Sequence, residues 1–353
     1  MRSSLLGLSL CSAFSALLGV SGCEGKAIDL PMPPTGKPFH YPLDEQLRLH
    51  HVQVRGTHNS YHVDTHDGSV EPWQYTHAPL YEQLDRQGIR QIELDVFLDD
   101  REGLRVVHVP YVDTGTRCHL FSECLAELRR FSDAFPGHFP LYIQIEPKAD
   151  IPSDDIESFV QRLEAEILTA FPRPRLLTPD EVQGNAATLS AALKTHGWPQ
   201  LAKLRGRVMF AFDTTGPIRT AYTHNKQDLH GRLLFVDSAP DDPFGAVSVL
   251  NDPTSDATAI GRAVKANFLV RTRADSDTTE ARSGDTSRGK AALQSGAHFI
   301  STDFPDLVPG FSYRFTVPDG MPARCNPGTA PTGCTPLALE DPAFVGSYSP
   351  PGN

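Results

Sequence analysis

"FPLYIQIEP" (residues 139–147) and "DDIESFVQRLEAEILTAF" (residues 154–171) decide the fold. The first stretch is an apolar run of strand length, and the second repeats apolar residues every three or four positions, as an amphipathic helix does. Similar pairs recur along the chain, so that about eight strand-like segments alternate with helical patterns. The strand-like segments are "HVQVRG", "IRQIELDVF", "LRVVHV", "FPLYIQIEP", "RVMFAFD", "LLFVDS", "NFLVRT" and "HFIST".

This βα alternation predicts an α/β fold, a TIM-like (β/α)8 barrel that could be imperfectly closed. An open doubly wound sheet is the alternative, because a pattern of segments does not show closure. In either fold, chemistry belongs at the carboxyl ends of the strands.

The amino-terminal 23 residues have the features of an export signal. One basic residue, Arg2, precedes the apolar stretch "LLGLSLCSAFSALLGV", and no acidic residue occurs before Cys23. "VSGC" (residues 20–23) resembles the lipobox of bacterial lipoproteins, which implies a lipidated Cys23 at the new amino terminus. The alternative is an ordinary signal peptide with an incidental cysteine. We expect an exported bacterial lipoprotein of the outer membrane or cell surface, or a secreted protein.

The remaining cysteines agree with export. Cys118 with Cys124, and Cys325 with Cys334, would each close a short loop through a disulfide. Thiolate metal binding is the competing interpretation, but neither pair has C-x-x-C spacing.

Charge and composition limit the partners and divide the chain. The formal net charge of −11 disfavours binding to a nucleic-acid backbone. An acidic surface also adsorbs poorly to anionic lipid, so we expect membrane contact through the lipid anchor. We also expect the protein to be a monomer. We divide the chain into a signal (1–23), a proline-rich tether (24–44), a folded domain (45–310) and a carboxyl-terminal extension (311–353).

Polar side chains gather at the ends of the first four predicted strands. Glu93 and Asp95 are two residues apart, so a strand presents both carboxylates on one face. Two such charges repel and raise at least one pKa unless a positive group lies between them. A hard divalent cation is one solution, and an ion-pair network with Arg90, Arg101 or Arg105 is the other. The other three strand ends carry His58 with Asn59, His108, and Glu146.

These groups divide by chemistry into ligands and proton carriers. Asn59, Glu93, Asp95 and Glu146 offer oxygen ligands that suit Ca²⁺, with Mg²⁺ as the alternative. Two histidines remain for proton transfer. A zinc site that uses the histidines has no support from H-x-x-x-H or HExxH spacing.

The four motifs "GTHNSYH", "IELDVF", "VVHVPY" and "LYIQIEPK", in this order, resemble the catalytic X half of phosphatidylinositol-specific phospholipase C. The likeness is greatest to the calcium-dependent bacterial branch of this PLC-like phosphodiesterase superfamily and extends over residues 45–310. It implies a TIM-like barrel, phosphatidylinositol as substrate, diacylglycerol and inositol cyclic phosphate as products, and Ca²⁺ as cofactor. It also implies that His58 and His108 are catalytic, that Asn59, Glu93, Asp95 and Glu146 bind the metal, and that Arg271 or Arg273 contacts the headgroup.

Other functions remain open beside this one. The lysine that animal members use for ring phosphates is missing from "RVMFAFD", which favours unphosphorylated phosphatidylinositol. A glycerophosphodiester phosphodiesterase or phospholipase D-like enzyme on the same barrel is the main alternative. A lipid-tethered headgroup-binding protein without catalysis is an alternative of another class.

Overall fold

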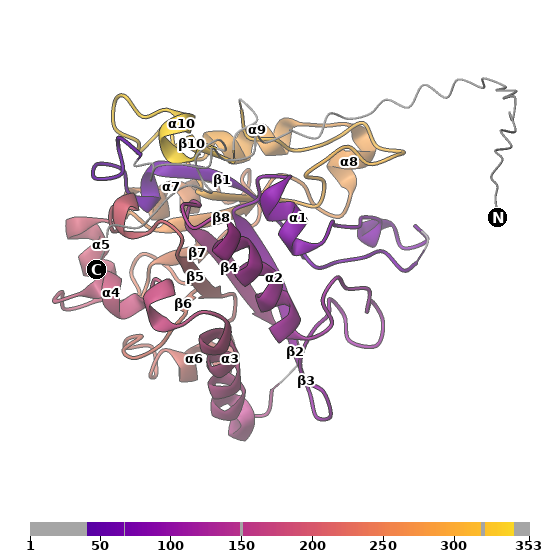
Figure 1. Ribbon diagram of the computed structural model, residues 1–353, viewed down its shortest axis with the longest axis horizontal. Coiled ribbons are helices and arrows are strands. Elements are labelled where there is room, and N and C mark those ends of the chain that lie inside the picture. The colour runs from indigo at the N-terminus through magenta and orange to yellow at the C-terminus, as the bar shows by residue number, and fades with distance from the viewer. Residues whose placement is uncertain (1–40, 67, 149–150, 319–321, 342–353) are drawn as a thin grey trace, which may run out of the picture.

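The computed structural model describes residues 41–66, 68–148, 151–318 and 322–341, which are built around a parallel β-barrel (Figure 1). Neighbouring strands follow the order β6-β5-β4-β2-β1-β9-β8-β7, with parallel pairing throughout. The barrel strands are β1 (Val52–Thr57), β2 (Gln91–Asp99), β4 (Leu141–Pro147), β5 (Val208–Phe212), β6 (Phe235–Val236), β7 (Val247–Val249), β8 (Leu269–Arg273) and β9 (Phe299–Thr302). The predicted TIM-like barrel, with imperfect closure, is confirmed.

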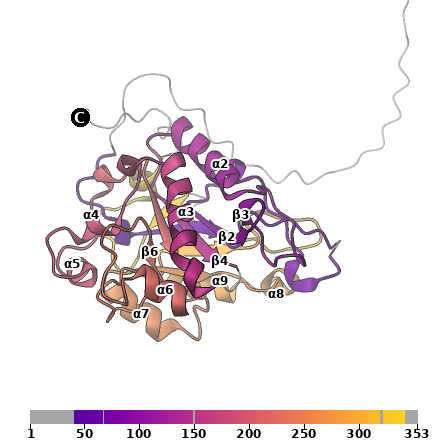
Figure 2. The ribbon, with the colours of Figure 1, turned by 90° about the horizontal axis from the view of Figure 1, so that it is seen from below.

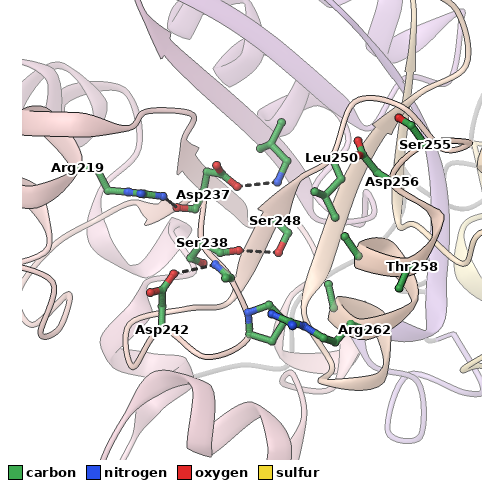
Figure 3. A pocket seen from close by; sticks show the side chains of 15 residues that line it. Arg219, Asp237, Ser238, Asp242, Ser248, Leu250, Ser255, Asp256, Thr258 and Arg262 are labelled. Carbon is green, nitrogen blue, oxygen red and sulfur yellow. Dashed lines mark hydrogen bonds between the residues drawn. The ribbon is translucent and has the colours of Figure 1, made fainter.

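Closure between β6 and β7 depends on a single parallel bridge, Asp237 to Val247. A cavity of about 620 Å³ lies beside this seam, between the β6–β7 connection and α7 (Ala257–Lys265) (Figure 3). Asp237 Oδ1 accepts a hydrogen bond of 2.8 Å from the Val249 amide. The Ser248 hydroxyl donates one of 2.7 Å to the Ser238 carbonyl. These bonds hold the seam where regular strand pairing stops.

Two further strands are antiparallel additions to the barrel. β3 (Gly103–Val106) forms a hairpin with β2, and β10 (Ala323–Cys325) pairs with β1. The assignment of "LRVVHV" to the parallel barrel is therefore wrong, because apolar alternation does not reveal the direction of pairing. The barrel strand that the sequence missed is β7, which has three residues and is too short for a recognisable pattern.

Amphipathic helices cover the outside of the barrel. α2 (Phe121–Ala134) and α3 (Ile156–Ala170) lie side by side (Figure 2) and bury apolar side chains along one face, among them Leu125 and Leu163. None of the described helices is long and apolar enough to span a bilayer. The remaining helices are α1 (Leu80–Asp85), α4 (Pro179–Gln183), α5 (Leu189–His196), α6 (Gly216–Tyr222), α8 (Thr279–Ser283), α9 (Ser287–Gln294) and α10 (Pro336–Leu339).

Both ends of the described chain pack against the barrel. Arg205 lies over the ring of Tyr41 and forms a buried ion pair of 2.7 Å with Asp44, so the folded part includes the last residues of the predicted tether. At the other end, the Glu340 carboxylate pairs with Arg90 in the interior. The predicted export signal with Cys23, residues 24–40 of the predicted tether and the tail from residue 342 lie outside the described residues.

Both predicted disulfides are confirmed. Cys118 is bonded to Cys124 at the start of α2, and Cys325 at the end of β10 is bonded to Cys334.

Candidate active site

The end of β1 turns sharply and exposes the first histidine. β1 ends at Thr57, and Asn59 has a φ of 42°, in the left-handed region that asparagine tolerates better than most residues, so the chain turns directly after His58. Ser60 fixes the turn to β2, because its amide donates to the Glu93 carbonyl at 3.0 Å and its hydroxyl accepts from the Glu93 amide at 2.8 Å. The "GTHNSYH" turn and the β2 carboxylates are thereby held together.

A buried carboxylate orients His58. Nδ1 of His58 lies 2.8 Å from Asp303 Oδ1, and Arg273 donates to Asp303 Oδ2 at 3.0 Å. Burial, and then the positive charge of Arg273, lower the pKa of His58 well below its usual value. His58 is therefore neutral at ordinary pH, with Nδ1–H toward Asp303 and the Nε2 lone pair available to accept a proton.

His108 has a carboxylate of its own. Nδ1 of His108 lies 2.8 Å from Asp113 Oδ2, and the same oxygen is 3.0 Å from His62 Nε2. Burial would raise the pKa of Asp113, but hydrogen bonds from His108 and His62 lower it below its usual value. The other ring nitrogen of His62 faces the Tyr75 carbonyl at 2.9 Å, so His62 donates to both acceptors only as an imidazolium.

The antiparallel course of β3 brings His108 to the barrel mouth. β2 extends past the barrel, β3 returns alongside it, and the Val107 amide bonds to the Asp95 carbonyl at 3.1 Å. His108 therefore follows β3 at the level of Asp95. The electrostatic influence of His108 contributes to the lowered pKa of His58.

Three carboxylates converge beside the histidines. Asp95 on β2 is directly opposite Glu146 on β4, and ligand atoms of Glu93, Asp95 and Glu146 lie within 4.8 Å of one another. Burial raises the pKa of Asp95 well above its usual range, and the charges of Glu146 and Glu93 act in the same direction. The predicted repulsion between these carboxylates is thus present.

Two basic side chains partly neutralise this cluster. Lys148 Nζ lies 3.0 Å from Asp95 Oδ2 and 2.6 Å from Glu146 Oε1. Arg271 pairs with Glu93 and also donates to Asn251 Oδ1. An ion-pair network therefore exists here, but its partners differ from those of the alternative interpretation. Arg90 pairs with Glu340 instead, and Arg105 pairs with Asp99 and Glu102.

The two arginines predicted for the headgroup both project from β8 and are both engaged. Arg271 is buried against Glu93, whereas Arg273, with about a tenth of its side chain exposed, is bound to Asp303. Asp213 follows β5, and burial, then the charges of Glu146 and Glu93, raise its pKa to about 8.

The comparisons with known proteins agree with this arrangement. The family model for calcium-dependent phosphoinositide phospholipase C matches residues 47–104 and 100–327. The chain belongs to the calcium-dependent phosphoinositide phospholipase C family. It is therefore a phosphodiesterase of the phospholipase C type. Among curated proteins, none matches this chain.

Solved structures share the fold. A Ca²⁺-dependent phosphatidylinositol-specific phospholipase C from Streptomyces antibioticus is 18% identical with a TM-score of 0.56, covering 73% of this chain and 95% of that one. A calcium-dependent phosphoinositol-specific phospholipase C from Pseudomonas sp. is 15% identical with a TM-score of 0.57, covering 80% of this chain and 97% of that one.

The family implies calcium, and the residues present fit that ion. Asn59 Oδ1 and Asp95 Oδ1 are buried and have no hydrogen-bond partner within the described parts of the chain. Together with Glu93 and Glu146 they form a set of oxygen donors, which Ca²⁺ prefers. The group His62, His108 and Asp113 also has ligand atoms within 4.8 Å, but hydrogen bonds already join them.

Four site residues of this phospholipase C-family chain escaped prediction: Asp303, Asp113, His62 and Lys148. Asp303 directly follows β9, so the rule that chemistry lies at strand ends could have found it. His62 and Lys148 stand inside the motifs "GTHNSYH" and "LYIQIEPK". Asp113 lies in a loop five residues after His108, and no pattern in the sequence distinguishes it from other loop carboxylates.

Proposed function

We propose that this protein is a Ca²⁺-dependent phosphodiesterase that cleaves phosphatidylinositol to diacylglycerol and inositol cyclic phosphate. One observation carries the proposal. Two histidines, each oriented through Nδ1 by a buried carboxylate, adjoin a converging set of oxygen ligands. Acid–base catalysis of an in-line displacement at phosphorus needs two proton carriers and a means to offset negative charge.

The histidines would divide the two proton transfers. The inositol 2-hydroxyl attacks phosphorus and loses a proton, and the diacylglycerol oxygen leaves and gains one. We assign protonation of the leaving oxygen to His108, whose ring Asp113 holds through Nδ1 at 2.8 Å. Deprotonation falls to His58 or to a glutamate of the cluster. The contact of His58 Nδ1 with Asp303, which leaves Nε2 to accept a proton, favours His58 as the base, since Glu93 is bound to Arg271.

Asn59, Glu93, Asp95 and Glu146 would hold the calcium ion. When bound, the ion polarises a phosphate oxygen and the attacking hydroxyl, which stabilises charge in the transition state. The carboxylates fix its position, and the turn between β1 and β2 keeps Asn59 in register with Glu93.

Unphosphorylated phosphatidylinositol is the substrate that the site favours. Arg273 is the more accessible of the two predicted headgroup arginines, and Arg271 would reach an inositol hydroxyl only by leaving Glu93. Asp213, rather than a basic residue, follows β5, so this part of the mouth offers no attraction to ring phosphates.

We further propose that the chain is an exported, monomeric lipoprotein held at the cell envelope through lipid on Cys23. The support is the signal-like segment with its "VSGC" end and the two disulfides, which are typical of oxidising compartments. Mass spectrometry of the mature amino terminus, and size-exclusion chromatography in detergent, test the anchor and the monomer.

A substrate panel tests the activity. The purified full chain in detergent is given phosphatidylinositol, phosphatidylcholine, glycerophosphoinositol and glycerophosphocholine, each with excess Ca²⁺ or with chelator. We expect diacylglycerol from phosphatidylinositol with Ca²⁺, and loss of turnover in His108→Asn. His119→Asn, at an exposed histidine paired with Glu102, is the matched control.

The other outcomes identify the alternatives. Hydrolysis of the glycerophosphodiesters with intact phosphatidylinositol would identify a glycerophosphodiester phosphodiesterase. Release of phosphatidic acid would identify a phospholipase D-like enzyme. Saturable binding of phosphatidylinositol without turnover would support a headgroup-binding protein.

A further inference from the structure

Lys148 lies where a cation would bind. Its backbone amide is fixed to β2 by a 2.8 Å hydrogen bond to the Val96 carbonyl. From there the side chain reaches Asp95 at 3.0 Å and Glu146 at 2.6 Å. One ammonium thus joins two of the three carboxylates that the family likeness assigns to calcium.

The geometry admits one cation at a time at Asp95 Oδ2 and Glu146 Oε1. Ca²⁺ binds carboxylate oxygens at about 2.3–2.6 Å. An ion at that distance from these two oxygens would overlap the ammonium that contacts the same atoms. The two like charges would also repel at close range.

The charge balance allows the exchange. Glu93, Asp95 and Glu146 carry three formal negative charges, and Arg271 supplies one positive charge through Glu93. Lys148 leaves the group with net negative charge, whereas a divalent ion in its position would complete neutralisation. The lysine stem is flexible and about a fifth exposed, so the ammonium can move to solvent.

We propose that Lys148 is a tethered competitor of calcium, whose ammonium must leave Asp95 and Glu146 before the ion binds. The inference rests on the calcium site of the proposed function. Lys148 reduces the apparent calcium affinity in proportion to the fraction of time for which its ammonium is away from the site. It also keeps the acidic cluster folded when calcium is scarce.

The expected size of the effect follows from that occupancy. If the ammonium occupies the site for about 90–99% of the time, the apparent dissociation constant is weakened roughly 10- to 100-fold. Lys148→Met removes the charge and keeps an unbranched stem, so it should tighten calcium binding by that factor. Lys148→Arg keeps the competitor and should stay near the unaltered chain.

Isothermal titration calorimetry of Ca²⁺ into the purified full chain tests the inference, because the readout does not depend on turnover. Lys290→Met, at an exposed lysine of α9, is the control and should bind like the unaltered chain. With chelator present, Lys148→Met should unfold at a lower temperature than the unaltered chain. Added Ca²⁺ should raise the unfolding temperature of Lys148→Met more than that of the unaltered chain. If Lys148→Met does not fold, Lys148→Gln takes its place in both measurements.

The outcomes separate the two proposals. Tighter calcium binding in Lys148→Met supports the competitor, including the case in which the unaltered chain binds too weakly to detect. If the unaltered chain binds calcium and Lys148→Met binds it equally well or more weakly, the competitor role of Lys148 is overturned and the proposed calcium site stands. No binding by either chain overturns both.

Discussion

Replacing Asp303 with asparagine tests how the barrel prepares His58 for proton transfer. The carboxylate accepts from His58 Nδ1 at 2.8 Å and from Arg273 at 3.0 Å, while the Asp303 amide donates to Asp275 at 2.8 Å. Asparagine keeps the size and the backbone bond. Its NH₂ group can donate to His58 Nδ1, which would move the ring proton to Nε2.

The expected loss of kcat follows from that move of the ring proton. A positioned general base contributes about 10²–10⁴-fold to rate, and a histidine protonated on Nε2 accepts no proton there. We therefore expect Asp303→Asn to lower kcat by roughly 10²–10⁴-fold, or about 3–5 kcal/mol of barrier. KM reports separately on Arg273, because the substitution removes the negative charge that Arg273 contacts at 3.0 Å.

The assay measures kcat and KM for diacylglycerol release from phosphatidylinositol across pH, with saturating Ca²⁺. Asp306→Asn, the same change in the same loop at an exposed residue bonded to Gln87, is the control and should stay within about twofold. Circular dichroism checks the fold of both variants. A kcat for Asp303→Asn within threefold of the unaltered chain, with the same pH profile, would refute the role of Asp303 in orienting His58.

Three further predictions concern stability and membrane contact. Glu340→Gln leaves a buried arginine without its counter-ion and should cost about 3–5 kcal/mol in urea unfolding, whereas Glu82→Gln in an exposed helical pair should cost under about 1 kcal/mol. Burial lowers the pKa of His138 and of His298 from 6.5 to about 4, so the unfolded chain binds more protons between these values. Their stabilising contribution is complete above pH 6.5 and falls by about 1.4 kcal/mol per histidine for each pH unit below it, and glutamine at either position should flatten that slope. Tyr111, 82% exposed in the loop after His108, should contact lipid, so in the chain lacking residues 1–23 and its proposed anchor, Tyr111→Ser should weaken vesicle binding roughly tenfold in sedimentation assays; unchanged binding would exclude that contact.

Local patterns predicted the acidic half of the site well. Glu93 and Asp95 share a face because they are two apart on β2, and parallel pairing with β4 aligns Asp95 with Glu146. The rule that catalytic groups lie at carboxyl strand ends accounts for His58. His108 reaches the same mouth by a different route, through a hairpin that apolar alternation does not distinguish from a barrel strand.

Contacts between distant segments could not be predicted. Asp303 is 245 positions from His58, and the parallel pairing of β1 with β9 brings them together. Lys148 is part of the motif "LYIQIEPK", but its ion pairs depend on how a flexible side chain folds back over the end of β4. The pairing of Arg271 with Glu93 likewise needs the register of β8 against the far side of the barrel, which no local pattern contains.

The most direct test of the central claim is ³¹P NMR of the first product formed from phosphatidylinositol vesicles by the full chain with Ca²⁺. We predict a cyclic inositol phosphodiester signal that grows as phosphatidylinositol disappears, is lost with chelator, and is absent in His108→Asn. A phosphomonoester or phosphatidic acid signal as the first product, or turnover that persists in His108→Asn, would contradict the account.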